Sequence, residues 1–530
     1  MSDQTSEAIY DEIPYPNLCH NQTHPDRLAV IGRLLGMRPA PVTSCRVLEL
    51  AAAKGGNLAP LAQALPGSEF VGLDYSAVQV AGGQALLAGA GLANARLLQR
   101  DILQDTRDLG EFDYIIAHGL YSWTTAPVRQ RVLALCREQL APQGIAFISF
   151  NALPGWSMLR TMREMMLFRT RGIESAGERS VVARQFVHQL AELLPDDQYF
   201  GFYVQHYAEE LERRWPGGGV DPLLLHDEME VENTQFYFHE FHAQLEAAGL
   251  QYLSDADFHK NLLQDFAPER ARQIAALADG DFVALEQYMD IARNRTLRQA
   301  LVVRPDVQIE RRLQVSSEMM MQSHIALRGE LVAAGAGAPA GAQALTGKSG
   351  ARLATDHPVS LAAFAILLEQ SPQTLPFMEL LTAARAAANS QADLGTDAQV
   401  LAGNLVRGYT YDNEMVMLHS FAPPLTVTPG ERPVASPVAR WEAAQEYAVV
   451  ANLRQERVRL EPLAALLLPL LDGQHDREAL AAHLMGLIEK GDLQLKVRDR
   501  PVADMVALEV EQTVDWLARA GLIMREEAEA

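Results

Sequence analysis

The sequence predicts an α/β protein, with a doubly wound, mostly parallel sheet in the N-terminal half that carries a helical insertion, followed by mainly helical domains. Short apolar runs alternate with amphipathic helical segments over residues 24–153, which is the pattern of a parallel sheet covered by helices. The alternation stops after Phe150, where longer helical segments follow. Residues 460–523 contain three further amphipathic segments. These three observations predict the fold class.

Five apolar runs are expected to form strands, namely 46–50, 70–73, 96–99, 114–117 and 145–150. The helices around them are expected at 24–37, 57–65, 77–89 and 126–140. The last helix has a favourable start, because Pro127 follows two threonines. A helix at 238–250 and an edge strand at 251–258 are expected to complete the sheet, so that residues 157–232 would be a helical insertion.

Four units are expected, because 530 residues exceed what one hydrophobic core supports. The sheet domain would cover residues 1–260, and a helical middle domain would cover 261–332. A Gly/Ala-rich stretch, 333–351, is typical of a flexible linker or loop, and it begins a second regulatory or substrate-binding domain, 333–430. The three amphipathic helices at the end of the chain suggest a winged-helix-like module, 431–530.

The formal net charge of −22, from 67 acidic and 45 basic residues, repels phosphate backbones and attracts cationic partners. It argues against nucleic-acid binding and favours a basic partner such as a lysine-bearing protein, with simple solubility as the alternative. No apolar run reaches the roughly 18 residues of a membrane span, and residues 1–17 lack the apolar core of a signal peptide. With only three scattered cysteines, a cytoplasmic protein with reduced thiols is expected.

Carboxylates end three successive predicted strands: Glu49, Asp74 and Asp101. Open parallel sheets bind ligands at the carboxyl ends of their strands. The small-residue turn 51–57 lets a ligand approach the backbone and the helix N–H groups behind it. Asp74 can accept two hydrogen bonds from a ribose diol, and Asp101 with the apolar Ile102 could hold an adenine ring. The pattern predicts a nucleoside-bearing cofactor.

These strand ends resemble the first three motifs of class I S-adenosylmethionine-dependent methyltransferases, which have a Rossmann-like sheet. The segments that carry the resemblance are ELAAAKGGN, GLDY and QRDI. The resemblance implies that S-adenosyl-L-methionine is the methyl donor and S-adenosyl-L-homocysteine the product. The cofactor residues that it implies are, from the methionine part to the adenine, Glu49, Ala51, Gly55, Asn57, Asp74, Tyr75, Asp101 and Ile102, with His118 beside them.

A closer resemblance is to bacterial methyltransferases with a regulatory domain, which include the rickettsial protein-lysine methyltransferases. It covers nearly the whole chain, and its motifs become less specific after residue 260. It rests on YDEIPYPN (10–17), AHGLYSW (117–123), FNALPGW (150–156), HDEMEVENTQFYFHEF (226–241), EQYMDIARNRTLRQAL (286–301), NLRQERV (452–458) and LLPLLDG (467–473).

The family commonly has glycine where this chain has Ala51 and Ala53. If either position requires a positive φ, alanine is strained there by about 1 kcal/mol or more, and cofactor binding would be weakened. An NAD-dependent dehydrogenase is the alternative for such a sheet. Its fingerprint requires G-x-G-x-x-G directly after the first strand, whereas this chain has A-x-A-x-x-G and no obvious hydride-transfer residues.

Aromatic and polar side chains follow the fourth and fifth predicted strands, and two tyrosines precede the sheet. A lysine acceptor must lose a proton, and aromatic walls with a nearby proton acceptor lower that cost. His118 and Tyr121 are the expected catalytic residues, with His118 as proton acceptor or cofactor contact. Simple packing or strand-end hydrogen bonding is the alternative for each residue. The residues expected to bind substrate are Tyr10, Tyr15, Tyr121, Trp123, Asn151 and Trp156.

Two conspicuous motifs are not expected to bind ligands. Residues 347–349 (GKS) suggest a phosphate loop, but Ala342 replaces the glycine that the loop requires, and no strand is expected before it. His239 and His242 are three residues apart without a convincing third ligand, so no metal site is expected.

The expected function is therefore transfer of a methyl group by in-line displacement, in which catalysis consists mainly of placing the nucleophile. The expected acceptor is a protein lysine, held by the later domains. Two alternatives stay open: a small-molecule methyltransferase, and a catalytically silent regulator with the same fold. The chain could also form a homo-oligomer.

Overall fold

The structure, a computed structural model, describes residues 9–10, 12–311, 317–335, 338–339, 341–494 and 501–525. Positions 336, 337 and 340 of the Gly/Ala-rich stretch lie outside the described residues. So does most of the segment 1–17, in which no signal peptide is expected. Within the described residues, no helix has both the length and the apolar character needed to cross a bilayer.

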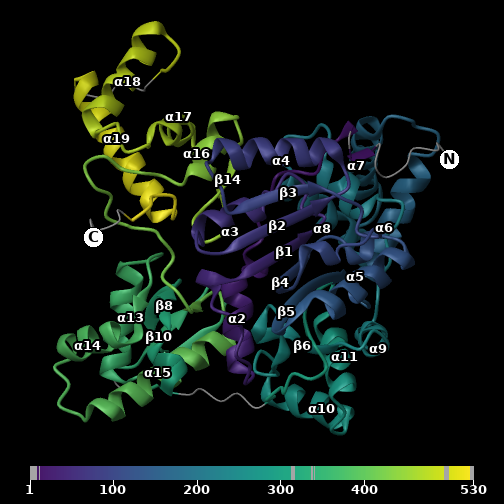
Figure 1. Cartoon of the computed structure of the whole chain (residues 1–530), viewed down its shortest axis with the longest axis horizontal. Helices are drawn as coiled ribbons and strands as arrows, with labels where there is room; N and C mark the ends of the chain where they lie inside the picture. Colours follow the sequence, from purple (N-terminus) through teal and green to yellow (C-terminus); the bar gives the residue numbers. More distant parts are fainter. Residues whose placement is uncertain are drawn as a thin grey trace.

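A seven-stranded sheet with the order β3-β2-β1-β4-β5-β7-β6 forms the centre of the molecule (Figure 1). The first five strands are parallel, and β7 runs antiparallel to both of its neighbours. The five predicted strands and the edge position of the sixth are confirmed. The strands are β1 (Arg46–Leu50), β2 (Glu69–Asp74), β3 (Ala95–Gln99), β4 (Phe112–Ala117), β5 (Leu140–Asn151), β6 (Gln251–Asp255) and β7 (Leu297–Val303).

Helices cover both faces of the sheet, as the alternating pattern predicts. Apolar side chains of α2 (Pro25–Leu34), α3 (Leu58–Ala64) and α4 (Ala77–Gly89) pack in one core. Those of α5 (Ala126–Gln139) and α9 (Phe238–Ala247) pack in a second core on the other face. Because both faces are buried, the parallel strands are apolar runs without strict alternation.

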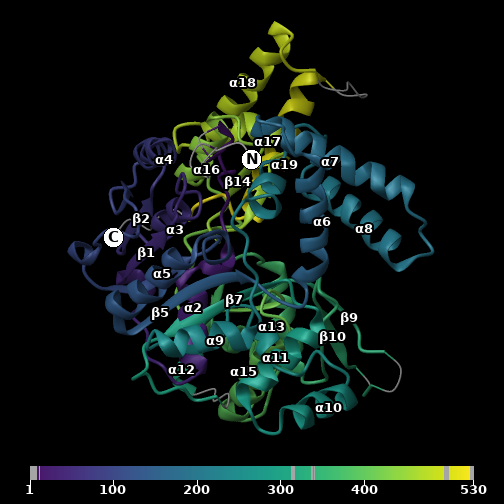
Figure 2. The same cartoon turned by 90° about the vertical axis from the view of Figure 1, so that its right-hand side faces the viewer.

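The predicted helical insertion is also confirmed. It contains α6 (Trp156–Arg169), α7 (Ala176–Leu193) and α8 (Tyr199–Arg214), which have a small core of their own. Figure 2 shows these helices projecting away from the sheet. A π-helical turn, Leu224–Glu228, leads back towards the sheet domain.

Strand β7 lies within the predicted helical middle domain, 261–332, and corrects that prediction. The helices α10 (Pro268–Ala278) and α11 (Phe282–Arg293) end before it, and β7 then inserts between β5 and β6. The sheet therefore continues past residue 260, the predicted end of the sheet domain. The strand is hard to recognise because Arg298 and Gln299, both buried, interrupt its apolar run.

The region after β7 also contains more strands than predicted. Two three-stranded sheets between β7 and the C-terminal module have the orders β11-β10-β9 and β12-β8-β13. Part of the Gly/Ala-rich stretch, predicted as a linker, forms β10 instead, and residues 347–349 lie in the turn between β10 and β11. The elements are α12 (Ser317–Met321), β8 (His324–Leu327), β9 (Glu330–Ala333), β10 (Gln343–Thr346), β11 (Arg352–Thr355), α13 (Pro358–Glu369), β12 (Leu375–Pro376), α14 (Phe377–Ala387), α15 (Leu394–Tyr411) and β13 (Val416–His419).

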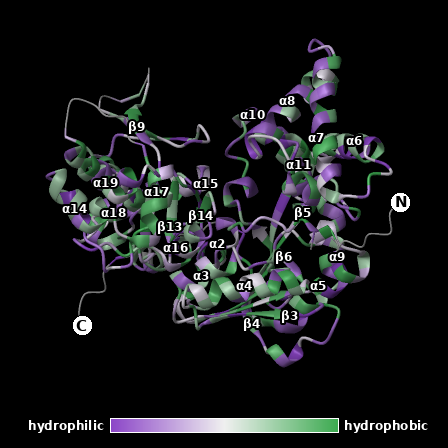
Figure 3. Ribbon diagram, turned by 90° about the horizontal axis from the view of Figure 1, so that it is seen from above, coloured by the Kyte–Doolittle hydropathy of each residue, from purple (hydrophilic) through white to green (hydrophobic). Residues whose placement is uncertain are grey.

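The C-terminal module has the three predicted amphipathic helices and a short hairpin that was not predicted. Figures 1 and 3 show this module and the region of α13–α15 on one side of the central sheet, opposite the insertion helices. The elements are α16 (Pro437–Ala444), β14 (Val449–Ala451), β15 (Arg457–Arg459), α17 (Pro462–Leu467), α18 (Arg477–Lys490) and α19 (Val502–Arg519).

Arg298 is fully buried and joins β7 to α11. Its Nε donates to Asp290 Oδ2 at 2.7 Å, and its terminal nitrogens reach Glu286 Oε2 at 2.8 Å and the Tyr252 hydroxyl at 3.0 Å. Buried charges of this kind are tolerated only when each one is paired and hydrogen-bonded.

Arg298→Leu is therefore expected to lower the free energy of unfolding by about 3–5 kcal/mol, because Asp290 and Glu286 would stay buried without a counter-charge. Urea denaturation followed by circular dichroism measures this change. Arg272→Leu is the control, since its ion pair with Glu269 is largely exposed, and its effect should stay within about 0.5 kcal/mol. Equal effects for the two variants would contradict this assignment.

Candidate active site

The turn after β1 has the backbone conformation that glycine usually supplies. The φ angles are 56° at Ala51, 48° at Ala53 and 72° at Gly55. Positive φ crowds the Cβ of an L-residue against a neighbouring backbone carbonyl, at a cost of about 1–2 kcal/mol. The two alanines that depart from the family pattern are therefore both in the left-handed region.

Neighbouring strands hold this strained turn in place. The N–H of Ala53 donates to Asp74 Oδ2 at 2.8 Å, and the N–H of Ala52 donates to the carbonyl of Leu73 at 2.9 Å. Gly56 has no room for a side chain, because a Cβ there would lie 2.3 Å from Asn17 Oδ1. The end of β2 and the N-terminal segment thus fix the turn between them.

Glu49 is buried at the end of β1 with one carboxylate oxygen satisfied. Its Oε1 accepts a hydrogen bond from Asn57 Nδ2 at 2.8 Å, whereas Oε2 is buried without a partner among the described residues. Burial raises the pKa of Glu49 to about 8, against the hydrogen bond from Asn57, and the charge of Asp74 adds to the rise. A cationic ligand group facing Oε2 would satisfy this oxygen and favour the ionised carboxylate.

Asp74 and Asp101 follow the two strands next to β1. Asp74 Oδ1 accepts from the N–H of Ser76 at 3.0 Å, and the ring of Tyr75 is 43% exposed beside it. Asp101 is exposed and accepts from the N–H of Leu103 at 2.9 Å, while Ile102 is buried. Because β1, β2 and β3 are adjacent and parallel, their carboxylates lie along one edge of the sheet.

This edge fits S-adenosylmethionine. The orphaned Glu49 oxygen suits the cationic methionine part, Asp74 suits a ribose diol, and Ile102 with the exposed Tyr75 offers an apolar surface for adenine. Leu97 packs against Gly55 and Asn17 against Gly56 where a Cβ would stand, so the two glycines let neighbouring segments close on the turn. The predicted cofactor residues that follow β1, β2 and β3 are therefore brought together.

His118 lies where β4 ends, and it contacts two neighbouring elements. Its Nδ1 is 2.9 Å from the hydroxyl of Ser149 on β5, and its ring packs edge-on against His20 with centroids 4.0 Å apart. Burial lowers the pKa of His118 to about 4, and the charge of Arg457 adds to the effect. The imidazole is therefore neutral at pH 7 and a weak base, which suits a contact residue better than a proton acceptor.

Tyr121, predicted as a catalytic and substrate-binding residue, lies away from this edge. Its ring is fully buried in the second core against Phe236 and Phe241, and its hydroxyl donates to Gln244 Oε1 at 2.8 Å. A residue just after a strand can point to either side of the sheet. Here the apolar side chains of α9 hold the ring in the core between that helix and the sheet.

Three other predicted substrate residues converge on the π-helical turn, two at Asp227 and one at His226. The hydroxyl of Tyr15 is 3.4 Å from Asp227 Oδ1, and Trp123 Nε1 donates to the Asp227 carbonyl at 2.9 Å. The ring of Tyr10 stacks on His226, with centroids 4.1 Å apart. Burial raises the pKa of Tyr10, and the charges of Glu230 and Asp227 add to the rise. Tyr15 lies two residues before Asn17, which packs on Gly56 in the turn after β1, so the N-terminal segment joins the acidic turn to the cofactor edge.

Asn151 reaches the same turn through one intermediate residue. Its Nδ2 donates to Asn233 Oδ1 at 3.1 Å, and Asn233 Nδ2 donates to the carbonyl of Asp227 at 2.9 Å. Trp156 is buried at the start of α6. Asp227 and Asn233 were not predicted as site residues. Both lie in the acidic segment HDEMEVEN (226–233), and nothing in its distance along the chain from the strands indicates that it folds back against Trp123 and Asn151.

The sheet order, the turn after β1 and the carboxylates beside it define a class I methyltransferase. Three family models match this chain: a methyltransferase domain at residues 48–146, a predicted methyltransferase regulatory domain at 221–304, and the PKMT C-terminal winged helix domain at 431–522. The winged-helix prediction for the C-terminal module is confirmed.

Curated relatives include RP789 of Rickettsia prowazekii, 30% identical over 500 residues, which are 92% of this chain and 87% of that protein. RP028 of the same organism is 33% identical over 46% of this chain and 95% of its own length. The chain thus belongs to the family of S-adenosylmethionine-dependent class I methyltransferases with a regulatory domain. PKMT2 from Rickettsia typhi, solved alone and in complex with AdoHcy, shares the fold at a TM-score of 0.82 and 22% identity, over 96% of this chain and 100% of that chain.

Asp74→Ala is expected to weaken binding of S-adenosylhomocysteine by roughly 2 kcal/mol, as for loss of a hydrogen bond to a charged group. Isothermal titration calorimetry measures the affinity. Asp105→Ala serves as the control, because this exposed carboxylate pairs only locally with Arg107, and its affinity should equal that of the native chain. An unchanged affinity for Asp74→Ala would mean that the ribose lies elsewhere.

Ala53→Gly is expected to raise the free energy of unfolding by up to about 1 kcal/mol. Relief of the left-handed strain, about 1–2 kcal/mol, exceeds the entropy that glycine adds to the unfolded chain. Ala275→Gly is the matched control: it places the same substitution on the exposed face of α10, where it should destabilise by about 1 kcal/mol. A lower midpoint temperature of thermal unfolding for both variants would refute the strain argument.

Proposed function

We propose that this chain transfers the methyl group of S-adenosylmethionine to the side-chain amine of a protein lysine. The observation that carries the proposal is the acidic and aromatic cluster of Tyr10, Tyr15, Trp123 and Asp227 beside the cofactor edge. Aromatic faces and a carboxylate attract an ammonium group, and the same carboxylate can accept its proton. S-adenosylmethionine, when bound, supplies an electrophilic methyl group.

Loss of the lysine proton is the step that requires help from the protein. At a reference pKa near 10.4, neutralising the amine at pH 7 costs about 4.6 kcal/mol. Burial raises the pKa of Asp227 to about 7, and the neighbouring Glu228 adds to this shift. A carboxylate with such a pKa accepts a proton at neutral pH more readily than an ordinary aspartate, so Asp227 is our candidate proton acceptor in place of His118.

Hydrogen bonds hold Asp227 in position for this role. Trp123 and Asn233 bind its carbonyl, and Tyr15 binds its carboxylate. Glu228, the next residue, is paired with Arg214 through two hydrogen bonds of 2.8 and 3.1 Å. The two adjacent carboxylates thus differ: one is locked in an ion pair, and the other faces the tyrosines of the N-terminal segment.

The comparisons support a protein acceptor. The PKMT label is shared by the family model of the C-terminal domain and by the neighbour from Rickettsia typhi. The net charge of −22 also favours a basic partner.

Incubation of the chain with S-adenosylmethionine carrying a labelled methyl group and a bacterial extract tests the proposal. We expect labelled protein bands whose hydrolysate contains methyl-lysine. Label found in metabolites alone would overturn the protein acceptor.

Asp227→Asn is expected to slow methyl transfer about 100-fold at pH 7, as for loss of a general base, with unchanged binding of S-adenosylhomocysteine. In the native chain the rate should fall as the pH falls through about 7, because protonated Asp227 cannot accept a proton. The pH–rate profile of Asp227→Asn should lack this decrease. Asp197→Asn, at an exposed site of the insertion, is the control. An equal rate for Asp227→Asn would exclude Asp227 as the base.

A further inference from the structure

The C-terminal domain reaches the cofactor edge through the turn of the β14–β15 hairpin, residues 452–456. Gln455, in this turn, is 2% exposed. Its Nε2 donates to Asn57 Oδ1 at 2.5 Å and lies 3.2 Å from the Asn57 carbonyl. Asn57 in turn donates to Glu49. Two hydrogen bonds therefore connect the C-terminal domain with the carboxylate that faces the cofactor.

Arg457 makes a second contact from the same hairpin. Its Nε donates to the carbonyl of Cys19 at 2.9 Å, and one terminal nitrogen lies 3.0 Å from His20 Nδ1. The ring of His20 packs against His118 at the end of β4. The hairpin thus supports the cofactor edge at two places, the turn after β1 and the residue after β4.

The hairpin turn is tied firmly to its own domain. Asn452 Nδ2 donates to the carbonyl of Ala520 at 2.9 Å, and the N–H of Leu453 donates to the carbonyl of Gly521 at 3.0 Å. Gln455 itself has a φ of 59°, a conformation that costs a non-glycine residue free energy and persists only when its surroundings hold it. A displacement of the C-terminal domain would therefore displace the Gln455 amide.

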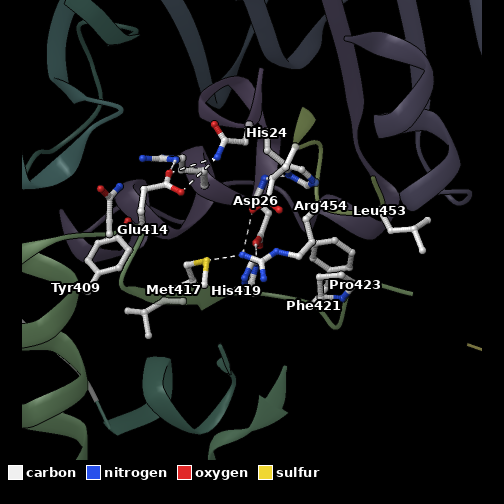
Figure 4. Close-up of a pocket in the computed structure, with 15 residues that line it drawn as sticks. His24, Asp26, Tyr409, Glu414, Met417, His419, Phe421, Pro423, Leu453 and Arg454 are labelled. Carbon is white, nitrogen blue, oxygen red and sulfur yellow. Dashed lines mark hydrogen bonds and ion pairs between the residues drawn. The ribbon is translucent and has the colours of Figure 1, made fainter. Parts of the chain in front are cut away.

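The region before the C-terminal domain meets the same turn from the other side. Arg328, which follows β8, donates to Glu456 Oε1 at 2.6 Å. Figure 4 shows Arg454 reaching Met417 of β13 beside Asp26 of α2, around a cavity of about 60 Å³. The cofactor domain, the β8–β13 sheet and the C-terminal domain therefore meet at one turn of five residues.

We propose that Gln455 is a positioning residue for the cofactor site, and that docking of the C-terminal domain and binding of the cofactor stabilise each other through it. The inference rests on the proposed use of S-adenosylmethionine and is independent of the methyl acceptor. Coupling of this kind is reciprocal: if docking strengthens binding by some factor, binding strengthens docking by the same factor.

The test compares Gln455→Gly with Glu446→Gly in the full-length chain. Both positions have a positive φ, 59° and 62°, but Glu446 is exposed, so both variants relieve strain and only the first removes the buried amide. We expect Gln455→Gly to bind S-adenosylhomocysteine about tenfold more weakly by calorimetry, which corresponds to about 1.4 kcal/mol. Glu446→Gly should bind like the native chain.

Hydrogen–deuterium exchange supplies the readout that a merely structural residue would not change. S-adenosylhomocysteine should slow amide exchange in residues 449–459 of the native chain and of Glu446→Gly, and should leave it unaltered in Gln455→Gly. Native affinity for Gln455→Gly, or cofactor-independent exchange of the hairpin in the native chain, would overturn the coupling alone. Failure of the native chain to bind S-adenosylhomocysteine would overturn the proposed function as well.

Discussion

The carboxamide of Asn57 is the group on which the arrangement of the cofactor edge depends. Its nitrogen donates to Glu49 and Thr23, and its oxygen accepts from the N–H of His20 and from Gln455. An amide buried at 5% exposure must have its donors and acceptors satisfied. One side chain therefore sets the relative positions of β1, the N-terminal segment and a hairpin 398 residues further along the chain.

The sheet and the positions of the carboxylates at its strand ends could be predicted because their signals are local. Buried parallel strands are apolar runs of characteristic length, and a carboxylate such as Glu49 or Asp74 at the end of one is visible without knowledge of other elements. β7 was not recognisable, because Arg298 within it is stabilised by carboxylates of α11. In the sequence alone, a charged residue within a strand cannot be distinguished from a residue on the polar face of a helix.

The acceptor side was only partly predictable, for a different physical reason. Which side of the sheet a loop residue faces depends on the helices packed there, and so Tyr121 entered the core while Trp123, two residues later, reached Asp227. Asp227 is hydrogen-bonded by Trp123, 104 positions away, and Gln455 binds Asn57, 398 positions away. Hydrophobic periodicity and motif spacing do not indicate such long-range contacts, because the contacts form only when separate elements pack together.

Burial raises the pKa of Glu49, whereas the hydrogen bond from Asn57 lowers it. Through Asn57, this balance connects the C-terminal domain with the cofactor edge. Burial favours the protonated acid, whereas the hydrogen bond from Asn57 favours the carboxylate, and a cationic ligand would favour it further. Asn57 presents its N–H group to Glu49 because its oxygen is engaged by His20 and Gln455. The C-terminal domain thus supports the charged form of a carboxylate that it never touches, by fixing the orientation of one amide.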